Sequence, residues 1–301
     1  MRCVHELEVK MKNKYNIGIF GGDLRQVYMT KELLKGGHNL ITYNLHEKVK
    51  DKNCIQAQNL NDLFKLSNLV IGPIPMSRDD ISIFSSKSLS DMTIAHVAYL
   101  LNKEHILFAG NIPSPITDIC ENKNIPYYDL MKNEKLTILN AIATAEGTLM
   151  EAIRNSNKNL HRSSCLILGY GRCGKVLARK LKALDANVTV TARSRDTLAY
   201  ANAFGNYTIP LNNIEVILSS FDFIFNTIPA LILDKKCLDL VNNDVLIIDI
   251  ASAPGGVDYN YAKKLGLNAR LCLGLPGKVA AESSASLLVS EILMLMKEVI
   301  K

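Results

Sequence analysis

One segment constrains the fold of this chain more than any other. The apolar run 165–168 leads into a glycine-rich turn and then into a helical pattern. The turn carries glycines at 169, 171 and 174, the GxGxxG spacing of dinucleotide-binding loops. The spacing alone is weak evidence, but here it follows an apolar strand and opens an amphipathic helix, which is the context that supports it. The segment therefore predicts a βαβ unit with a parallel sheet.

Each glycine of this turn has a separate expected role. Gly169 makes the tight turn, Gly171 lets the backbone approach a pyrophosphate, and Gly174 allows the helix to pack closely on the strand. Arg172 and Cys173 open the helix, where free N–H groups and the positive end of the helix dipole favour phosphates. The alternative is a glycine-rich turn that binds no ligand.

The end of the next strand predicts which nicotinamide dinucleotide binds. NAD-binding domains place an Asp or Glu there, about 20 residues on, to bind the ribose 2′-hydroxyl. This chain instead reads Arg193-Ser194-Arg195, with no acid. Guanidinium groups bind a phosphate dianion through paired N–H donors, which favours NADP, with NAD as the alternative. A second interpretation is that Arg193 stacks on adenine or faces solvent.

Short apolar runs alternate with helical patterns along most of the chain. Strands of parallel sheets are covered on both faces and read as continuous apolar runs. The predicted fold class is therefore α/β, with two doubly wound parallel-sheet lobes, the second a Rossmann dinucleotide-binding domain. The expected strands are 16–20, 39–43, 69–72, 106–109, 165–168, 187–191, 223–226, 245–250 and 269–271, and the clearest helical patterns are 24–35, 116–123, 172–184 and 195–204.

A long segment without proline is expected to join the two lobes, because its apolar residues follow helical spacing. We expect it to form a linker helix over 133–157. The other expected parts are a loose leader over 1–15 (with Met11 as an alternative start), an N-terminal α/β domain on the substrate side over 16–132, a Rossmann NADP-binding domain over 158–279, and a C-terminal helix over 280–301 that packs back on the linker.

Composition excludes several classes of protein. The net charge of +6 lies mainly after residue 158, which suggests an anionic ligand or a solubilising surface. Nucleic acid is disfavoured as a ligand, since the chain has no Trp and no Lys/Arg run.

The cysteines and histidines predict neither a disulfide framework nor a metal site. The seven cysteines include no CxxC pair, and the histidines lack the spacing of metal ligands. Without a signal peptide or an apolar span of about 18 residues, the protein is expected to be soluble, cytoplasmic and reduced.

Two loops at the ends of neighbouring strands are expected beside the nicotinamide half of the cofactor. The first contains Thr227, Ile228 and Pro229, and the second follows Asp249 and contains Ser252. Ligands of open α/β sheets bind outside the carboxyl ends of the strands, which is where both loops would lie. Either loop could instead be only a tight turn.

The first lobe also opens with a strand and a glycine turn, Gly21-Gly22, followed by Asp23 and Arg25. It lacks GxGxxG, so we predict no second dinucleotide site. Asp23 and Arg25 are expected to face a cleft between the lobes, where ligands usually bind. The alternative is an Asp that caps a helix and an Arg on the surface. Arg78, in another strand-end loop, is either an anion anchor or a solvated side chain.

Lys278 lies in a rigid turn that is expected to enter a helix. At the positive end of a helix its charged form would be destabilised, so Lys278 could donate a proton or a hydrogen bond to a substrate. The alternative is a cation that holds a phosphate or a water. A Ser/His/Asp hydrolase is not indicated, because there is no GxSxG motif.

Together these pieces resemble the A subunits of dipicolinate synthases, the enzymes of spore-forming bacteria that make the calcium chelator of the spore core. The resemblance covers nearly the whole chain from Asn16 onward. The matching pieces are Gly21-Gly22-Asp23 with Arg25-Gln26, Thr144-Ala-Glu146-Gly147, 168–174, Asn226-Thr-Ile-Pro229-Ala230, 251–256 and 274–280.

The resemblance implies the oxidation of dihydrodipicolinate to dipicolinate with hydride transfer to NADP, in the mother cell of a sporulating bacterium. It also implies a flavoprotein-like B subunit of dipicolinate synthase as partner and a small dicarboxylate as substrate; a homo-oligomer is expected too. Lys278 and Asp23 are then the candidate catalytic residues, with Asp23 or a water taking the proton. Gly22, Arg25 and Ser252 are the candidate substrate-binding residues.

The second lobe is similar to the cofactor domain of D-2-hydroxyacid dehydrogenases, with one departure. Those enzymes carry a catalytic His before the last helix of that domain, and this chain has Gly277-Lys278 there. The departure weakens an assignment to hydroxyacid chemistry. Two alternatives remain, a related NAD(P)-dependent amino or hydroxy acid dehydrogenase and a non-catalytic nucleotide-sensing Rossmann protein. A sensor needs no proton donor, so Asp23 and Lys278 favour an enzyme.

Overall fold

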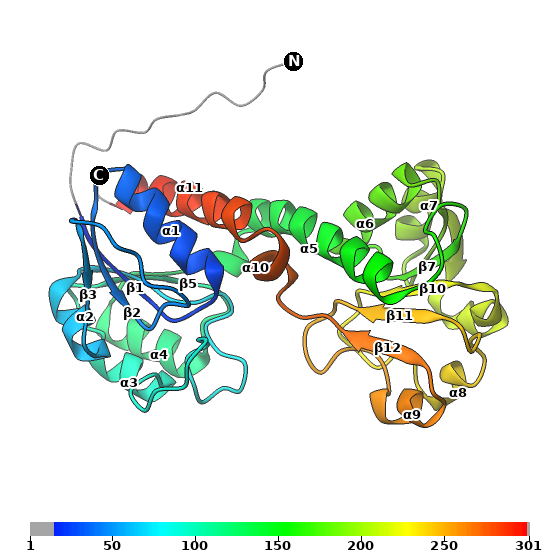
Figure 1. The fold of residues 1–301 in the computed structure, drawn as a ribbon, viewed down its shortest axis with the longest axis horizontal. Helices are drawn as coiled ribbons and strands as arrows, with labels where there is room; N and C mark the ends of the chain where they lie inside the picture. The colour runs from blue at the N-terminus through cyan, green and yellow to red at the C-terminus, as the bar shows by residue number, and fades with distance from the viewer. Residues whose placement is uncertain (1–14, 300–301) are drawn as a thin grey trace, which may run out of the picture. The chain divides into compact units, whose positions relative to one another are not determined.

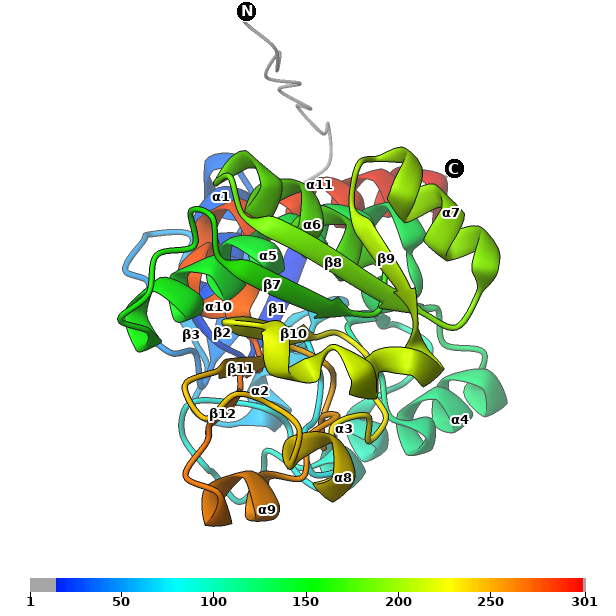
Figure 2. The ribbon, with the colours of Figure 1, turned by 90° about the vertical axis from the view of Figure 1, so that its right-hand side faces the viewer.

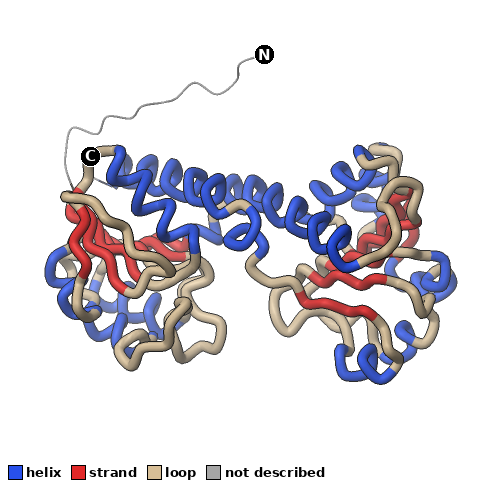
Figure 3. Tube along the Cα trace, in the orientation of Figure 1, coloured by secondary structure: helices blue, strands red, loops and turns tan. Residues whose placement is uncertain are grey.

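The computed structural model describes residues 15–299, which form two compact units (Figure 1). Unit 1 takes the chain up to Thr137 and resumes at Ala281, and unit 2 is Ile138–Ala280. In both units the strands lie between helices (Figure 3). The leader expected over 1–15 lies outside the described residues except for Tyr15. The domain limits expected from the sequence stay predictions.

Unit 1 is built on a sheet of six parallel strands in the order β3-β2-β1-β4-β5-β6. The chain adds strands on one side of β1 and then returns to add β4 on its other side. The loops after β1 and β4 therefore diverge at a topological switch point. The strands are β1 (Asn16–Phe20), β2 (Asn39–Tyr43), β3 (Cys54–Gln56), β4 (Leu69–Ile71), β5 (Ile106–Ala109) and β6 (Tyr127–Asp129).

Helices cover both faces of this sheet, which is why its strands are apolar on both sides. One core lies between the sheet and α1 (Leu24–Lys35) with α11 (Ala281–Val299). The other lies between the sheet and α2 (Leu60–Leu66), α3 (Ile94–Leu100) and α4 (Ser114–Lys123). The two helices α1 and α11 come from opposite ends of the chain and pack along each other (Figure 1).

Unit 2 repeats this architecture with a second sheet of six parallel strands, β12-β11-β10-β7-β8-β9. Counted within each unit, the two sheets have the same strand order. The expected fold class, two doubly wound parallel-sheet lobes, is confirmed. The strands are β7 (Ser164–Leu168), β8 (Asn187–Ala192), β9 (Tyr207–Pro210), β10 (Phe223–Asn226), β11 (Leu246–Asp249) and β12 (Asn268–Leu271).

Helices again pack on both faces of the second sheet (Figure 2). One core includes α5, α6, α7 and α10, and the other includes α8, α9 and two short 3₁₀ helices. The bounds are α5 (Glu134–Asn155), α6 (Arg172–Ala183), α7 (Arg195–Ala203), α8 (Lys235–Leu238), α9 (Tyr259–Lys264) and α10 (Leu275–Val279).

The helix α5 begins in unit 1 and continues through unit 2. At its start, the buried carboxylate of Glu291 on α11 accepts hydrogen bonds from Asn133 at 2.5 Å and Lys135 at 3.4 Å. Farther along, a Cβ atom at Gly147 would stand 2.9 Å from the Cβ of Leu275, so glycine lets α5 and α10 approach closely. Within residues 15–299 no helix is both long enough and apolar enough to cross a bilayer.

Candidate functional site

The glycine turn joins the carboxyl end of β7 to the amino end of α6. Gly169 has a φ of +95°, a conformation that glycine adopts readily, and its N–H donates to the Thr191 carbonyl at 2.9 Å. A Cβ atom at Gly174 would stand 2.3 Å from the Gly169 carbonyl oxygen, so packing requires glycine there. A Cβ atom at Gly171 would meet no described atom within 4 Å. Gly171 therefore borders open space.

The amino end of α6 offers backbone donors to that space. Gly171 is the N-cap residue of this twelve-residue helix and has no side chain with which to cap it. Cys173 follows in the first turn, where burial raises the pKa of its thiol and the neighbouring charge of Arg172 partly offsets that effect. Because helix amino ends attract anions, this geometry suits the pyrophosphate of a dinucleotide.

The loop after β10 lies against the glycine turn. Thr227 donates to the carbonyl of Leu168 through its backbone N–H at 3.0 Å and through Oγ1 at 2.9 Å. A Cβ atom at Gly169 would stand 2.6 Å from Thr227 Oγ1 and 2.9 Å from the side chain of Ile228. The structure thus brings together three residues that the sequence assigned to the cofactor. Pro229 follows them and is exposed.

A fully buried carboxylate, Asp249, joins the loops after β10 and β11. Its Oδ1 accepts hydrogen bonds from Asn226 Nδ2 and the N–H of Ala251, both at 2.9 Å. Its Oδ2 accepts hydrogen bonds from the N–H of Gly256 at 2.6 Å and the hydroxyl of Tyr259 at 2.8 Å. Four donors from three segments therefore compensate the cost of burying this charge.

The sequence interpretation gave no role to Asn226, Asp249 or Tyr259. Burial and the hydrogen bond to Asp249 raise the pKa of Tyr259, so its hydroxyl stays a donor. The sequence feature that could have identified Asn226 and Asp249 is that each is a polar residue at the end of an apolar strand. Ser252 stands exposed in the loop that Asp249 organises, where its carbonyl accepts from the N–H of Gly255 at 2.9 Å.

The residues expected to select the cofactor follow β8. Ser194 is the N-cap of α7, and its Oγ accepts from the N–H of Thr197 at 3.4 Å. Arg193 and Arg195 are exposed, and within residues 15–299 neither forms an ion pair. Two guanidinium groups thus stand on either side of a helix start, at the carboxyl end of a strand beside the glycine turn.

In unit 1, Asp23 caps α1 and binds Arg25. Its Oδ1 accepts a hydrogen bond from the backbone N–H of Arg25 at 3.0 Å. The backbone N–H of Asp23 in turn donates to Oε1 of Gln26 at 3.0 Å, which completes a capping box. The guanidinium of Arg25 donates to both carboxylate oxygens, at 2.9 and 2.8 Å. Burial alone would raise the pKa of Asp23, but these contacts, helped by the charge of Arg78, lower it below its ordinary value.

The structure excludes one of the two alternatives for Arg25, a position on the surface. Its side chain is 4% exposed, so it is not a surface arginine. Besides holding Asp23, it donates to the carbonyl of Ile74 in the loop after β4. Gly22, beside them, has a φ of +77°. Contact of Gly22, Asp23 and Arg25 with a substrate stays a prediction.

Lys278 lies in the last turn of α10, which runs only from Leu275 to Val279. The rigid turn expected before the C-terminal helix is itself this short helix, and only Ala280 separates it from α11. The role expected for Lys278 stays a prediction. Its side chain is exposed. Burial raises the pKa of the neighbouring Cys272 thiol, and the charge of Lys278 partly offsets that rise.

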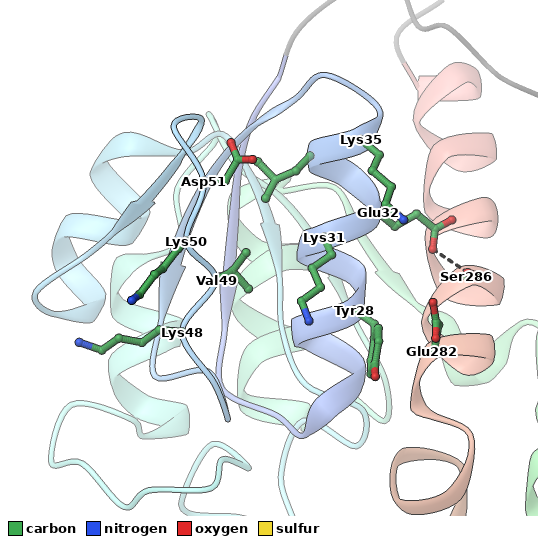
Figure 4. A pocket seen from close by; sticks show the side chains of 11 residues that line it. Tyr28, Lys31, Glu32, Lys35, Lys48, Val49, Lys50, Asp51, Glu282 and Ser286 are labelled. Atoms are coloured by element: carbon green, nitrogen blue, oxygen red, sulfur yellow. Dashed lines mark hydrogen bonds between the residues drawn. The ribbon is translucent and has the colours of Figure 1, made fainter.

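A groove of about 800 Å³ crosses unit 1 between α1, the loop after β2 and the start of α11 (Figure 4). The groove is positively charged, because its four lysines outnumber its three acidic residues. One of the acidic residues, Glu32, accepts a hydrogen bond from the hydroxyl of Ser286 at 2.7 Å. None of the residues predicted for the site lines it. The lysines are Lys31, Lys35, Lys48 and Lys50.

Two family models match the chain. Residues 16–131 match the N-terminal domain of the A subunit of dipicolinate synthase. Residues 129–256 match the NAD-binding domain of D-isomer specific 2-hydroxyacid dehydrogenases, which confirms the similarity expected for the second lobe and supports a nicotinamide dinucleotide as the cofactor.

Whole-chain comparisons point the same way. The chain is 29% identical over 293 residues to the dipicolinate synthase A subunit of Bacillus subtilis (strain 168), covering 94% of this chain and 96% of that protein. The crystal structure of the dipicolinate synthase A subunit from Bacillus halodurans matches with a TM-score of 0.82 and 28% identity, over 93% of this chain and 97% of that one. The Bacillus subtilis crystal structure has the same TM-score and identity, over 96% and 98%. The resemblance to these A subunits is confirmed.

Proposed function

We propose that this chain, as an A subunit of a dipicolinate synthase, oxidises dihydrodipicolinate to dipicolinate with hydride transfer to NADP. Its relatives and its dehydrogenase-type domain support an oxidoreductase that uses a nicotinamide dinucleotide. The observation that carries the proposal is the open space beside Gly171 at the amino end of α6, where a Cβ atom would meet nothing within 4 Å and where backbone donors suit a pyrophosphate.

The preference for NADP rests on Arg193 and Arg195. Both are exposed and without an ion pair within residues 15–299, so their donors are available to a 2′-phosphate. Ser194 lies between them and stabilises the start of α7, because its hydroxyl caps that helix. No acid stands at this strand end to favour an unmodified ribose.

Aromatisation of the substrate ring removes one hydride and one proton. The nicotinamide, when bound, accepts the hydride. Contacts with Arg25 lower the pKa of Asp23, so its side chain is a carboxylate at neutral pH. We propose that Asp23 or a water takes the proton that leaves. We propose Lys278 as the donor of a hydrogen bond to the substrate, because its exposed ammonium suits an anion.

The proposal also covers partners and location. The name of the relatives designates an A subunit, which supports a second polypeptide as partner, and we propose a flavoprotein-like B subunit. We also propose that the chain forms a homo-oligomer and works in the cytoplasm of the mother cell of a sporulating bacterium.

The test is turnover by the purified chain, with and without the B subunit, under NADP and under NAD. Dipicolinate absorbs in the ultraviolet, so its formation from the condensation product of aspartate semialdehyde and pyruvate is followed directly. We expect NADP-dependent product. Cofactor reduction with 2-hydroxy or 2-amino acids, and no dipicolinate under any condition, would assign the chain to another dehydrogenase. Cofactor binding without any turnover would favour a nucleotide sensor.

A further inference from the structure

The switch point of the first sheet brings two loops together. The N–H of Gly22, after β1, donates to the carbonyl of Phe84 at 2.7 Å, and the N–H of Phe84 donates to the carbonyl of Met76 at 2.9 Å. Isolated bridges also pair Gly22 with Ser85 and Ser77 with Ile83. The segment after β4 is therefore folded back against the glycine turn that precedes α1, at the sheet edge where ligands of this fold class bind.

Arg25 cannot serve as a free cation at this edge. Its Nε and one of its terminal nitrogens already hold both oxygens of Asp23, and the same terminal nitrogen donates to the carbonyl of Ile74. The side chain is almost fully buried. Moving it to a ligand would leave the half-buried Asp23 without its partner, which is costly.

Arg78 is the available cation in the same place. Its guanidinium carbon lies 3.7 Å from the centroid of the Phe84 ring, and its side chain is exposed. Within residues 15–299 it forms no ion pair, although its charge acts on Asp23. A guanidinium stacked on an aromatic ring keeps its N–H donors at the edge of the plane, where a carboxylate binds them in pairs.

The acidic neighbour of Arg78 does not compete for it. Asp79 accepts hydrogen bonds within its own turn, from the N–H groups of Ile81 at 3.0 Å and Ser82 at 2.7 Å, and from the Ser77 hydroxyl at 3.1 Å. These backbone hydrogen bonds lower the pKa of Asp79 to about 2. The carboxylate of Asp79 therefore stabilises its own turn and forms no ion pair with Arg78.

We propose that Arg78, held by Phe84, binds one carboxylate of the ring dicarboxylate on which this chain acts. The proposal rests on the function proposed above and adds a specificity-determining residue to it. Arg78 fixes the substrate beside the ionised Asp23, and Arg25 acts as the positioning residue that holds Asp23 in place. Phe84 orients the guanidinium plane.

The first test measures binding without catalysis. Pyridine-2,6-dicarboxylate is titrated calorimetrically into the NADP-loaded full chain and into Arg78→Met. We expect the affinity to fall at least tenfold in the variant. The matched control is Lys103→Met, which removes one exposed positive charge just before β5, at the opposite edge of the same sheet, and should bind as the wild type does. Equal affinity for wild type and Arg78→Met would overturn the proposal.

The second test measures turnover. Arg78→Met should raise the KM for dihydrodipicolinate at least tenfold and leave the affinity for NADP unchanged. Arg78→Lys should recover only part of the loss, because it keeps the charge without the planar fork. Phe84→Leu should raise KM and leave kcat near the wild-type value, a split that a general loss of folded protein does not produce.

The two proposals fail in different ways. If wild type forms dipicolinate and Arg78→Met does so with the same KM, the assignment of Arg78 is wrong and the reaction stands. If wild type binds pyridine-2,6-dicarboxylate through Arg78 but forms no dipicolinate, the carboxylate site stands and the proposed reaction is wrong.

Discussion

Asn226 Nδ2 donates to Oδ1 of Asp249 at 2.9 Å, although these residues end different strands and are 23 positions apart. The register of β10 and β11 places them opposite each other. Since Asp249 also holds Ala251 and Gly256, one buried carboxylate sets the shape of two strand-end loops. The candidate site of unit 2 therefore depends on a group that need not touch a ligand.

The Asp249 network predicts a contrast between two tyrosines of α9. Tyr259→Phe removes a hydrogen bond to the buried Asp249 and should cost about 1.5–3 kcal/mol, the usual value for a charged acceptor. Tyr261→Phe removes an equally short bond, 2.8 Å, to the exposed Asp239 and should cost under about 0.5 kcal/mol. Denaturant unfolding of both variants measures the difference. Equal losses of unfolding free energy would mean that the hydrogen bond to the buried Asp249 stabilises the fold no more than one to an exposed acceptor does.

The glycine turn predicts opposite outcomes for Gly171→Val and Gly174→Val. At Gly171 the new side chain enters open space, so the melting temperature should stay near the wild-type value and dinucleotide binding should be lost. At Gly174 the side chain would overlap the Gly169 carbonyl, so the protein itself should be destabilised. Thermal unfolding and cofactor titration separate the two effects. Unchanged NADP affinity in Gly171→Val would make the turn purely structural.

The cofactor preference is tested by reversing one charge. Arg193→Asp should weaken NADP binding by about 1.5–3 kcal/mol, because a charge-assisted hydrogen bond to the 2′-phosphate is lost. Binding of NAD, which lacks that phosphate, should change little or improve. Arg162→Asp, an exposed site before β7 at the other sheet edge, is the control and should alter neither affinity. The same NADP affinity in wild type and Arg193→Asp would contradict the assignment.

The lowered pKa of Asp23 predicts a specific dependence of stability on pH. A carboxyl group with a lowered pKa stabilises the folded state above its ordinary pKa of 3.8, and this contribution is lost as the pH falls through the lowered value. Asp23→Asn keeps a capping side chain but leaves Arg25 buried without its partner charge, at a cost of about 3 kcal/mol.

The gap in melting temperature between wild type and Asp23→Asn should therefore be constant from pH 8 to pH 5 and narrow only in stronger acid. Asp118→Asn, an exposed site on α4, should follow wild type throughout. A gap that already narrows between pH 7 and pH 5 would show that the pKa of Asp23 is not lowered.

Lys278 is tested through the split between turnover and cofactor affinity. Lys278→Ala should lower turnover strongly and leave NADP affinity nearly unchanged, because the residue lies in α10 and the phosphate loop precedes α6. Lys278→Arg keeps the charge but places it differently, so it should rescue turnover poorly. Near-normal dipicolinate formation by Lys278→Ala would remove it from the catalytic residues.

Much of the fold was predictable because the central strands are buried on both faces. The expected strands 16–20 and 39–43 coincide with β1 and β2, and the helical pattern 24–35 coincides with α1. Three edge strands escaped prediction, since a half-exposed edge needs no continuous apolar run. They are β3, β6 and β9. Helices of seven residues or fewer, such as α2 and α9, are too short to show a period.

The candidate site was predictable only where local sequence determines it. The turn from Gly169 to Gly174 is a local motif, and the structure agrees with it. The pairing of Asn226 with Asp249 depends on strand register, and the burial of Arg25 depends on a loop 49 residues away. The turn that carries Lys278 is the short helix α10, which the sequence did not predict because five residues are too few to show a helical period.

The packing of α1 against α11 has a consequence for how the chain folds during synthesis on the ribosome. Met29 and Leu33 share a core with Leu288 and Ile292, which are synthesised more than 250 residues later. All strands and helices of unit 2 are complete before α11 emerges, because its sequence lies wholly between the two parts of unit 1. A nascent chain therefore lacks the partner of this face of α1 until α11, at the end of the sequence, has been synthesised.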